Sequence, residues 1–143
     1  MAAADATPLS FRDSDFTSFS TFWAARTVIR WPNVPFDPQV DVPAADSAFV
    51  GVNLLGASGG EGRQGVKSFM REGSMTIQIY TRAGRSTDEV YSLANAVLEF
   101  FELRSTTKAE DGYFKAARSV EIGPDGTWYQ LDVTADYIYF TNR

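Results

Sequence analysis

The chain contains neither cysteine nor histidine among its 143 residues. Without cysteine it forms no disulfide, offers no thiolate nucleophile and has no cysteine ligand for a metal. Without histidine it lacks the commonest general base, the Ser-His-Asp triad and any imidazole-bound zinc. An enzyme built on this sequence would have to use carboxylates, lysine, tyrosine or serine alone. The two absences weaken an enzyme interpretation, and we predict no catalytic residue, cofactor or metal site.

Long apolar runs and an excess of positive charge are also missing. No apolar run approaches the roughly 20 residues that a membrane span needs, and the first residues lack the basic start and apolar core of a signal peptide. The net charge of -5 argues against wrapping nucleic acid, because that affinity comes from neutralising phosphates. With 44% hydrophobic and 22% charged residues, the composition predicts one soluble domain over residues 1–143, with residues 1–9 flexible.

The clearest pattern in the sequence runs from Val66 to Phe101. Residues 67–71 lead through Glu72-Gly73 into residues 74–82, which indicates a strand, a turn and a second strand. The second strand alternates apolar with polar side chains, so one set should face the core. That set is Met75, Ile77 and Ile79.

A helix is predicted next, because Ser86 and Glu89 form a capping box. Apolar residues then recur at helical spacing, opposite a polar stripe. The apolar stripe is Val90, Leu93, Ala94, Val97 and Phe101. The pattern therefore predicts a helix, ending near Leu103, that packs one face on a sheet.

The N-terminal third predicts a second helix and a stiff connector. Residues 11–26 place Phe16, Phe19 and Trp23 on one helical stripe, and residues 27–31 fit either the end of that helix or a short strand. Three prolines between Trp31 and Pro38 exclude a regular helix and a central strand there. Residues 39–47 are expected to form exposed loop.

A strand and a glycine-rich segment follow. Residues 48–55 are β-prone, and Val50, Val52 and Leu54 form the better core face. Residues 57–65 are predicted to be a flexible glycine-rich loop. Gly60, Gly62 and Gly65 match the dinucleotide-binding pattern G-x-G-x-x-G, but a strand rather than a helix is expected after them, which excludes that interpretation.

The C-terminal third predicts an antiparallel hairpin. Residues 112–122 read as a strand, residues 123–126 (Gly-Pro-Asp-Gly) as a turn, and residues 127–140 as the last strand. The fold class is therefore α+β: a small, antiparallel-rich mixed sheet, a main helix packed on one face, and an N-terminal helix.

Three groups of residues invite a functional interpretation. Asp132 and Asp136 share a strand face and could act as paired carboxylates for acid–base chemistry or as an oxygen-ligand metal site, although a solvated strand face is the commoner arrangement. Trp128, Tyr129, Tyr137 and Tyr139 could stack on bases, but no basic residue accompanies them, which favours packing or a protein interface. Arg63, Lys67 and Arg71 form a basic run that could meet an acidic neighbour.

The order of the predicted elements resembles that of the tail terminator proteins of tailed bacteriophages. The resemblance covers most of the chain, and it rests on the order of elements and on short motifs such as Trp-Pro-Asn-Val-Pro-Phe-Asp-Pro. The matching segments are Phe11–Arg26, Trp31–Pro38, Phe49–Leu55, Gly65–Arg82, Ser86–Leu103 and Gly112–Phe140. Thr81-Arg82-Ala83-Gly84-Arg85 departs from the Pro-x-Gly-x-Gly turn that many relatives have before the helix.

The resemblance implies a structural virion protein that assembles in the host cytoplasm. Such proteins form a hexameric ring that caps the tail tube and joins the tail to the head through a neck or connector protein, while genome DNA passes through without specific binding. Ring closure needs one surface of a subunit to fit a different surface of the next. The residues proposed for subunit or partner contacts are Trp31, Phe36, Phe49, Val50, Leu54, Arg63, Lys67 and Arg71.

Three alternatives remain open from the sequence, of which the plainest is a folding scaffold or dimer module. A head-completion or connector protein of the neck would also form a ring, docked on the portal side. A small α+β ligand-binding domain would instead have a pocket between the sheet, at Ile77 and Ile79, and the helix from Val90 to Phe101.

Overall fold

The sheet and its two long helices form an α+β domain, as the sequence predicts. The computed structural model describes residues 8–24, 26–42, 48–63, 68–84, 87–106 and 113–142. Five strands form one mixed sheet in the order β1-β2-β3-β5-β4. The elements are α1 (Pro8–Trp23), β1 (Val28–Arg30), α2 (Pro38–Asp41), β2 (Ala48–Arg63), β3 (Ser68–Arg82), α3 (Asp88–Thr106), β4 (Tyr113–Asp125) and β5 (Trp128–Asn142). Only β1 and β2 pair in parallel, whereas the other described pairs are antiparallel.

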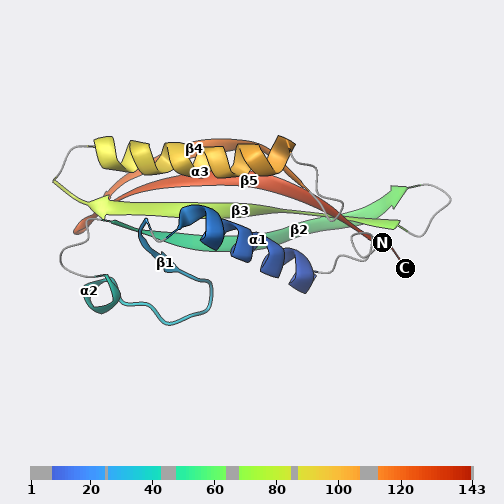
Figure 1. Ribbon diagram of the computed structural model, residues 1–143, viewed down its shortest axis with the longest axis horizontal. Coiled ribbons are helices and arrows are strands. Elements are labelled where there is room, and N and C mark those ends of the chain that lie inside the picture. The colour runs from blue at the N-terminus through green and yellow to red at the C-terminus, as the bar shows by residue number, and fades with distance from the viewer. Residues whose placement is uncertain are drawn as a thin grey trace.

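One face of the sheet lies under α1 and α3, and we call it the helix face (Figure 1). The predicted alternation of β3 is confirmed, because Met75, Ile77 and Ile79 are fully buried there. The predicted stripe of α3 packs against them, with Val90, Ala94, Val97 and Phe101 buried and Leu93 partly buried. Phe19 and Trp23 of α1 complete this core. In the described part of the chain, no helix has the length and apolarity that a membrane span requires.

The opposite face is polar along most of its length, and we call it the open face. Thr76 of β3 and Thr134 of β5 share a hydrogen bond between their hydroxyls at 3.0 Å. The connector after β1 covers one end of this face, where Phe36 lies 5.1 Å from Phe49 between ring centroids. The sheet is therefore buried on one face and largely wet on the other, as is common in antiparallel sheets.

The central strands differ from the prediction at two places. β3 runs without a turn through Glu72 and Gly73, which pair with Ser58 and Gly56 on one side and with Ile138 and Tyr137 on the other. The predicted glycine-rich loop is also wrong over residues 57–63, because β2 continues to Arg63 and pairs with β3 as far as Ser68. Residues 64–65 lie outside the described residues. Glycine lowers the strand propensity of this segment, but pairing with β3 overrides that preference.

Gly73 explains why β3 continues where a turn was predicted. Tyr137 of β5 lies across Gly73, and its hydroxyl donates a hydrogen bond to the Leu55 carbonyl of β2 at 3.1 Å. A Cβ at position 73 would come within 2.1 Å of that carbonyl oxygen and 2.3 Å of the Tyr137 hydroxyl. The glycine therefore allows a close crossing within the sheet rather than a chain reversal.

The helix and strand boundaries otherwise follow the prediction with small shifts. α1 ends at Trp23, and the short β-branched segment forms β1 rather than continuing the helix. α3 begins at Asp88, and the capping residue Ser86 lies outside the described residues. The segment after the connector was predicted to be exposed loop, but Pro38–Asp41 form one helical turn and Val42 is buried.

The C-terminal hairpin is confirmed, with its turn displaced towards the last strand. Pro124 and Asp125 pair with Tyr129 and Trp128, which leaves Gly126 and Thr127 as the turn. Gly126 has a φ of 64°, and a positive φ at the first central position is typical of glycine in a two-residue hairpin turn. Pro124 fits the ladder because β4 is an edge strand.

Replacing Gly73 with alanine should destabilise the protein strongly. The added methyl would collide with a backbone carbonyl and with Tyr137, and overpacking of this kind costs about 3 kcal/mol. Urea unfolding of Gly73→Ala measures the loss. Ser74→Ala, at the next position on the open face, is the matched control and should change the free energy of unfolding little. An unchanged midpoint for Gly73→Ala would contradict the close crossing.

Candidate functional site

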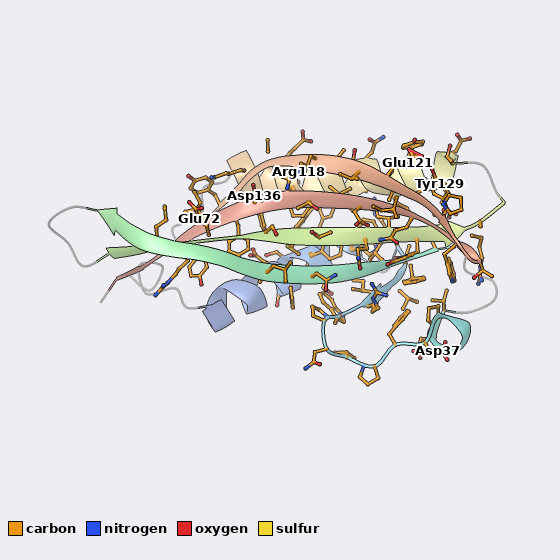
Figure 2. All side chains as sticks on the ribbon, turned by 180° about the vertical axis from the view of Figure 1, so that it is seen from behind. Asp37, Glu72, Arg118, Glu121, Tyr129 and Asp136 are labelled. Carbon is orange, nitrogen blue, oxygen red and sulfur yellow. The ribbon has the colours of Figure 1, made fainter. Side chains whose placement is uncertain are left out.

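The two aspartates proposed as paired carboxylates do not form a joint site. Both lie on the open face of β5, but each has its own partner. Gln130 Nε2 donates to Asp132 Oδ1 at 2.9 Å, whereas Arg118 Nη1 lies 3.8 Å from Asp136 Oδ2 (Figure 2). Positions four apart on a strand are separated by roughly 13 Å. Among the described residues no group of three acidic side chains is arranged to hold a metal.

The aromatic residues of β5 also separate into different environments. Trp128 packs on the open face, with its ring centroid 4.9 Å from that of Phe49. Tyr137 and Tyr139 are buried on the helix face and stack with centroids 6.0 Å apart. Because these rings lie on opposite faces of the sheet, they cannot stack together on a flat ligand. Packing, one of the two arrangements that the sequence favours over base stacking, accounts for Tyr137 and Tyr139.

A surface carboxylate between two phenols was not predicted from the sequence. The hydroxyls of Tyr91 on α3 and Tyr129 on β5 both donate to Glu121 of β4, and Figure 2 shows Glu121 and Tyr129 side by side. The hydrogen bond from Tyr129, followed by that from Tyr91, lowers the pKa of Glu121. The hydrogen bond to Glu121 raises the pKa of Tyr129 from 10.0 to about 12. The arrangement fixes the edge of β4 to α3.

The aromatic residues proposed for subunit contacts pack within the chain itself. Trp31 lies against Phe16 of α1, with ring centroids 5.2 Å apart. Phe36 covers Phe49, which also stacks on Tyr80 with centroids 4.6 Å apart. The connector is therefore pinned to the domain by aromatic contacts.

Two of the proposed contact residues are corrected by their burial. Phe49 is 1% exposed and Val50 is 0% exposed, so neither side chain offers a surface to a neighbouring subunit. Phe49 lies under the connector on the open face, and Val50 lies in the core under the helices. The β-prone pattern of residues 48–55 reflects burial inside the subunit. A sequence alone does not distinguish this from burial at an interface between subunits.

The remaining proposed contact residues occupy different positions. Leu54 is partly buried against the core. Arg71 lies on β3 opposite Tyr139, and its positive charge partly offsets the burial that raises the pKa of Tyr139. Arg63 belongs to β2, and Lys67 lies outside the described residues, so the structure does not describe the predicted basic run as a unit.

The space proposed for a ligand between the sheet and α3 is filled by side chains. Ile77, Ile79, Val90, Val97 and Phe101 are all fully buried there. An open hollow does lie between α1 and the connector, and its lining is Phe16, Thr17, Ser20, Thr21 and Trp31. None of the lining residues that the structure describes has an ionisable side chain.

The two edges of the sheet are the surfaces best suited to an interaction. β4 is an edge strand, and its residues Arg118–Ile122 are exposed in succession on both faces. At the other edge, β1 pairs only with Phe49–Gly51 of β2, so no described strand pairs with the outer edge of β2 from Val52 onwards. Open edges present unpaired N–H and C=O groups to a further strand. In the sequence, the apolar residues Val120 and Ile122 were the feature from which an interaction at the β4 edge could have been predicted.

Three strands also extend beyond the helices at one end of the domain. β2, β3 and β5 continue past the ends of α1 and α3 towards the C-terminus (Figure 1). The paired segments there are residues 58–63, 68–72 and 138–142. We call these segments the distal arm.

Comparisons with known proteins support the fold only. No family model matches the chain, and no curated protein matches it. Solved structures do share the fold. One of them, whose description names no function, has a TM-score of 0.58 at 12% identity, covering 90% of this chain and 94% of that chain.

Removing the ring of Phe49 should lower the stability of the single subunit. Phe49→Ala would leave a cavity beneath Phe36, Tyr80 and Trp128, and such a change costs about 3–5 kcal/mol. Chemical unfolding at a low protein concentration, where association does not contribute, measures the effect. Val34→Ala in the same connector, at an exposed side chain, is the control. A Phe49→Ala subunit as stable as the control would contradict the burial of this ring.

The contact between Tyr129 and Glu121 should appear in an alkaline titration. Because folding raises the pKa of Tyr129 to about 12, the stability linked to its proton is present below pH 10 and is lost as the pH rises through 12. Glu121→Gln removes the negative charge, so the pKa of Tyr129 should fall towards 10. Absorbance of tyrosinate near 295 nm follows the titration, with Glu99→Gln on the exposed side of α3 as control. An identical titration in Glu121→Gln and wild type would contradict the contact.

Proposed function

We propose that this protein is a ring-forming tail terminator, a structural virion protein that caps the tail tube and joins the tail to the head. The observation that carries the proposal is the pair of open sheet edges on opposite sides of one subunit, together with a distal arm that extends beyond the helices. The order of α1, connector, β2–β3, α3 and closing hairpin agrees with the resemblance found in the sequence. The absence of histidine and cysteine is consistent with a role that needs no chemistry.

The shape of the subunit suits head-to-tail association. The edges at β2 and β4 differ from each other, and a contact between two different surfaces leads to a ring when the rotation closes. The distal arm supports the same assembly, because a narrow ribbon of strands gains stability when it packs against another surface. A neighbouring subunit would supply that surface.

The charge of the chain fits passage of DNA through such a ring. The net charge is -5, and Asp132 and Asp136 are partly exposed on the open face. Carboxylates that face a DNA conduit would repel phosphate and keep the genome from binding in transit. The proposal therefore requires a ring that surrounds DNA without specific contacts.

The native mass of the purified protein tests this function directly. Light scattering over a range of concentrations should give a mass near six subunits, either for the protein alone or after tail-tube protein is added. A shift to rings with portal-side protein but not with tube protein would instead indicate a neck connector. A monomer at every concentration and with both partners would contradict the proposal.

A further inference from the structure

We propose that copies of this chain join by antiparallel pairing of β4 of one subunit with β2 of the next, through residues 117–121 and 52–56. The partner is a second copy of the same chain. The inference rests on the proposed ring and names the contact that would hold it together. It differs from the contacts proposed at the sequence level, since Trp31, Phe36, Phe49 and Val50 pack within the subunit.

The two edges offer regular segments of matching length. On β4, register shifts occur between Phe114 and Ala117 and between Glu121 and Gly123, so the ladder is regular from Ala117 to Glu121. On β2, pairing with β1 ends at Gly51, and the register with β3 stays regular as far as Gly56. The regular segments 117–121 and 52–56 therefore match in length, and each is close to the usual length of a paired strand.

The exposed side chains of the two segments match in chemistry. Val120 is 50% exposed on β4, and Leu55 is 63% exposed on β2. They lie on the same face of the sheet. Val120 of β4 pairs with Asp132 of β5, which shares a face with Thr134 two positions along the same strand. Leu55 of β2 shares a face with Asn53, and Asn53 pairs with Thr76 of β3. Thr76 and Thr134 are hydrogen-bonded on the open face. Pairing of residues 117–121 with 52–56 would place Val120 opposite Asn53 of the next subunit and diagonally beside Leu55. Val120 and Leu55 would both be removed from water.

The direction of the strands allows the pairing to repeat. β2 to β3, β3 to β5 and β5 to β4 are each antiparallel, so β4 runs opposite to β2. A rotation about an axis inclined to the strands would bring β4 of one subunit antiparallel to β2 of the next, with the open face kept on the same side. The contact joins two different surfaces, and repeated rotation of this kind closes into a ring.

The features that flank the two segments limit the pairing to one register. The shifts on both sides of residues 117–121, and the charged Lys115 before them, disfavour unlimited growth of the sheet at β4. On β2, β1 occupies the positions before Val52, and a further shift follows Gly56. A longer partner strand would find no regular hydrogen-bonding positions beyond the two ends of these segments.

Cysteine cross-linking tests the contact without background, because the chain has no cysteine of its own. Asn53→Cys with Val120→Cys in one chain should give a covalent ladder up to the full ring under mild oxidation, since directly opposed residues meet the distance that a disulfide needs. Each single variant can link no more than two chains. Leu55→Cys with Val120→Cys tests the register shifted by two residues, and Leu103→Cys with Val120→Cys, from exposed α3, is the control that should not form a ladder.

A charged substitution gives an independent measurement. Val120→Asp should raise the concentration at which rings dissociate by about tenfold, because the carboxylate would be buried beside Leu55 of the neighbour. Leu103→Asp, at a similarly exposed position on α3, should leave that concentration unchanged. Thermal unfolding of both variants as monomers checks that each subunit still folds.

The outcomes separate this inference from the proposed function. A ladder in the Asn53–Val120 pair, with weaker rings for Val120→Asp, supports the edge contact. Rings of normal mass that show no ladder in either register and resist Val120→Asp would overturn the contact while leaving the ring intact. A protein that never forms rings would overturn both.

Discussion

The pairing of the central strands depends on the absence of a side chain at Gly73. Only without a Cβ at this position can Tyr137 cross β3 and donate its hydroxyl to the Leu55 carbonyl of β2. The crossing joins β2, β3 and β5 where the pairing continues towards the distal arm. A side chain at position 73 would separate these strands and shorten the ladder. The length of β2, and with it the open edge from Val52 onwards, therefore follows from the close approach at Gly73.

The two faces of the sheet are stabilised in different ways. On the helix face, aliphatic residues of β3 and β5 pack beneath α3 and exclude water. On the open face, Phe36, Phe49, Tyr80 and Trp128 form a cluster of rings at one end. Beyond this cluster the face carries hydroxyls, amides and carboxylates that water can solvate. The connector thus protects the end at which β1 pairs, and it leaves the middle of the β2 edge accessible.

The sequence predicts the elements where local pattern and tertiary packing agree. The alternation around Ile77 and the helical stripe of Val97 and Phe101 report burial directly, and both are confirmed. The predictions fail where glycine has a tertiary role. Gly73 and the glycines of residues 56–62 suggested a turn and a loop, because the pattern contains no information on Tyr137, more than sixty positions later, or on the pairing with β3.

The candidate surface was harder to predict than the fold. The sequence identified apolar residues such as Phe49 and Val50 as contacts, yet the same character placed them inside the subunit. An edge is defined by which strand lacks a neighbour, and this depends on the strand order, with β4 outermost, and on how early β1 ends. Val120 and Leu55 differ from other exposed aliphatic residues only because the strand order places them at open edges. Their positions on opposite edges and on the same face give them a joint role.

Open edges normally carry a risk of uncontrolled association, and this subunit restricts that risk by geometry. Register shifts interrupt both edges within a few residues of the regular segments, so a partner can pair over a short length only. A short antiparallel contact is weak by itself, and it becomes stable when each subunit makes it twice, once at β2 and once at β4. Closure of a ring supplies this second contact, whereas an open chain always leaves two edges unpaired. The same irregularities that limit aggregation would therefore favour a closed assembly over a filament.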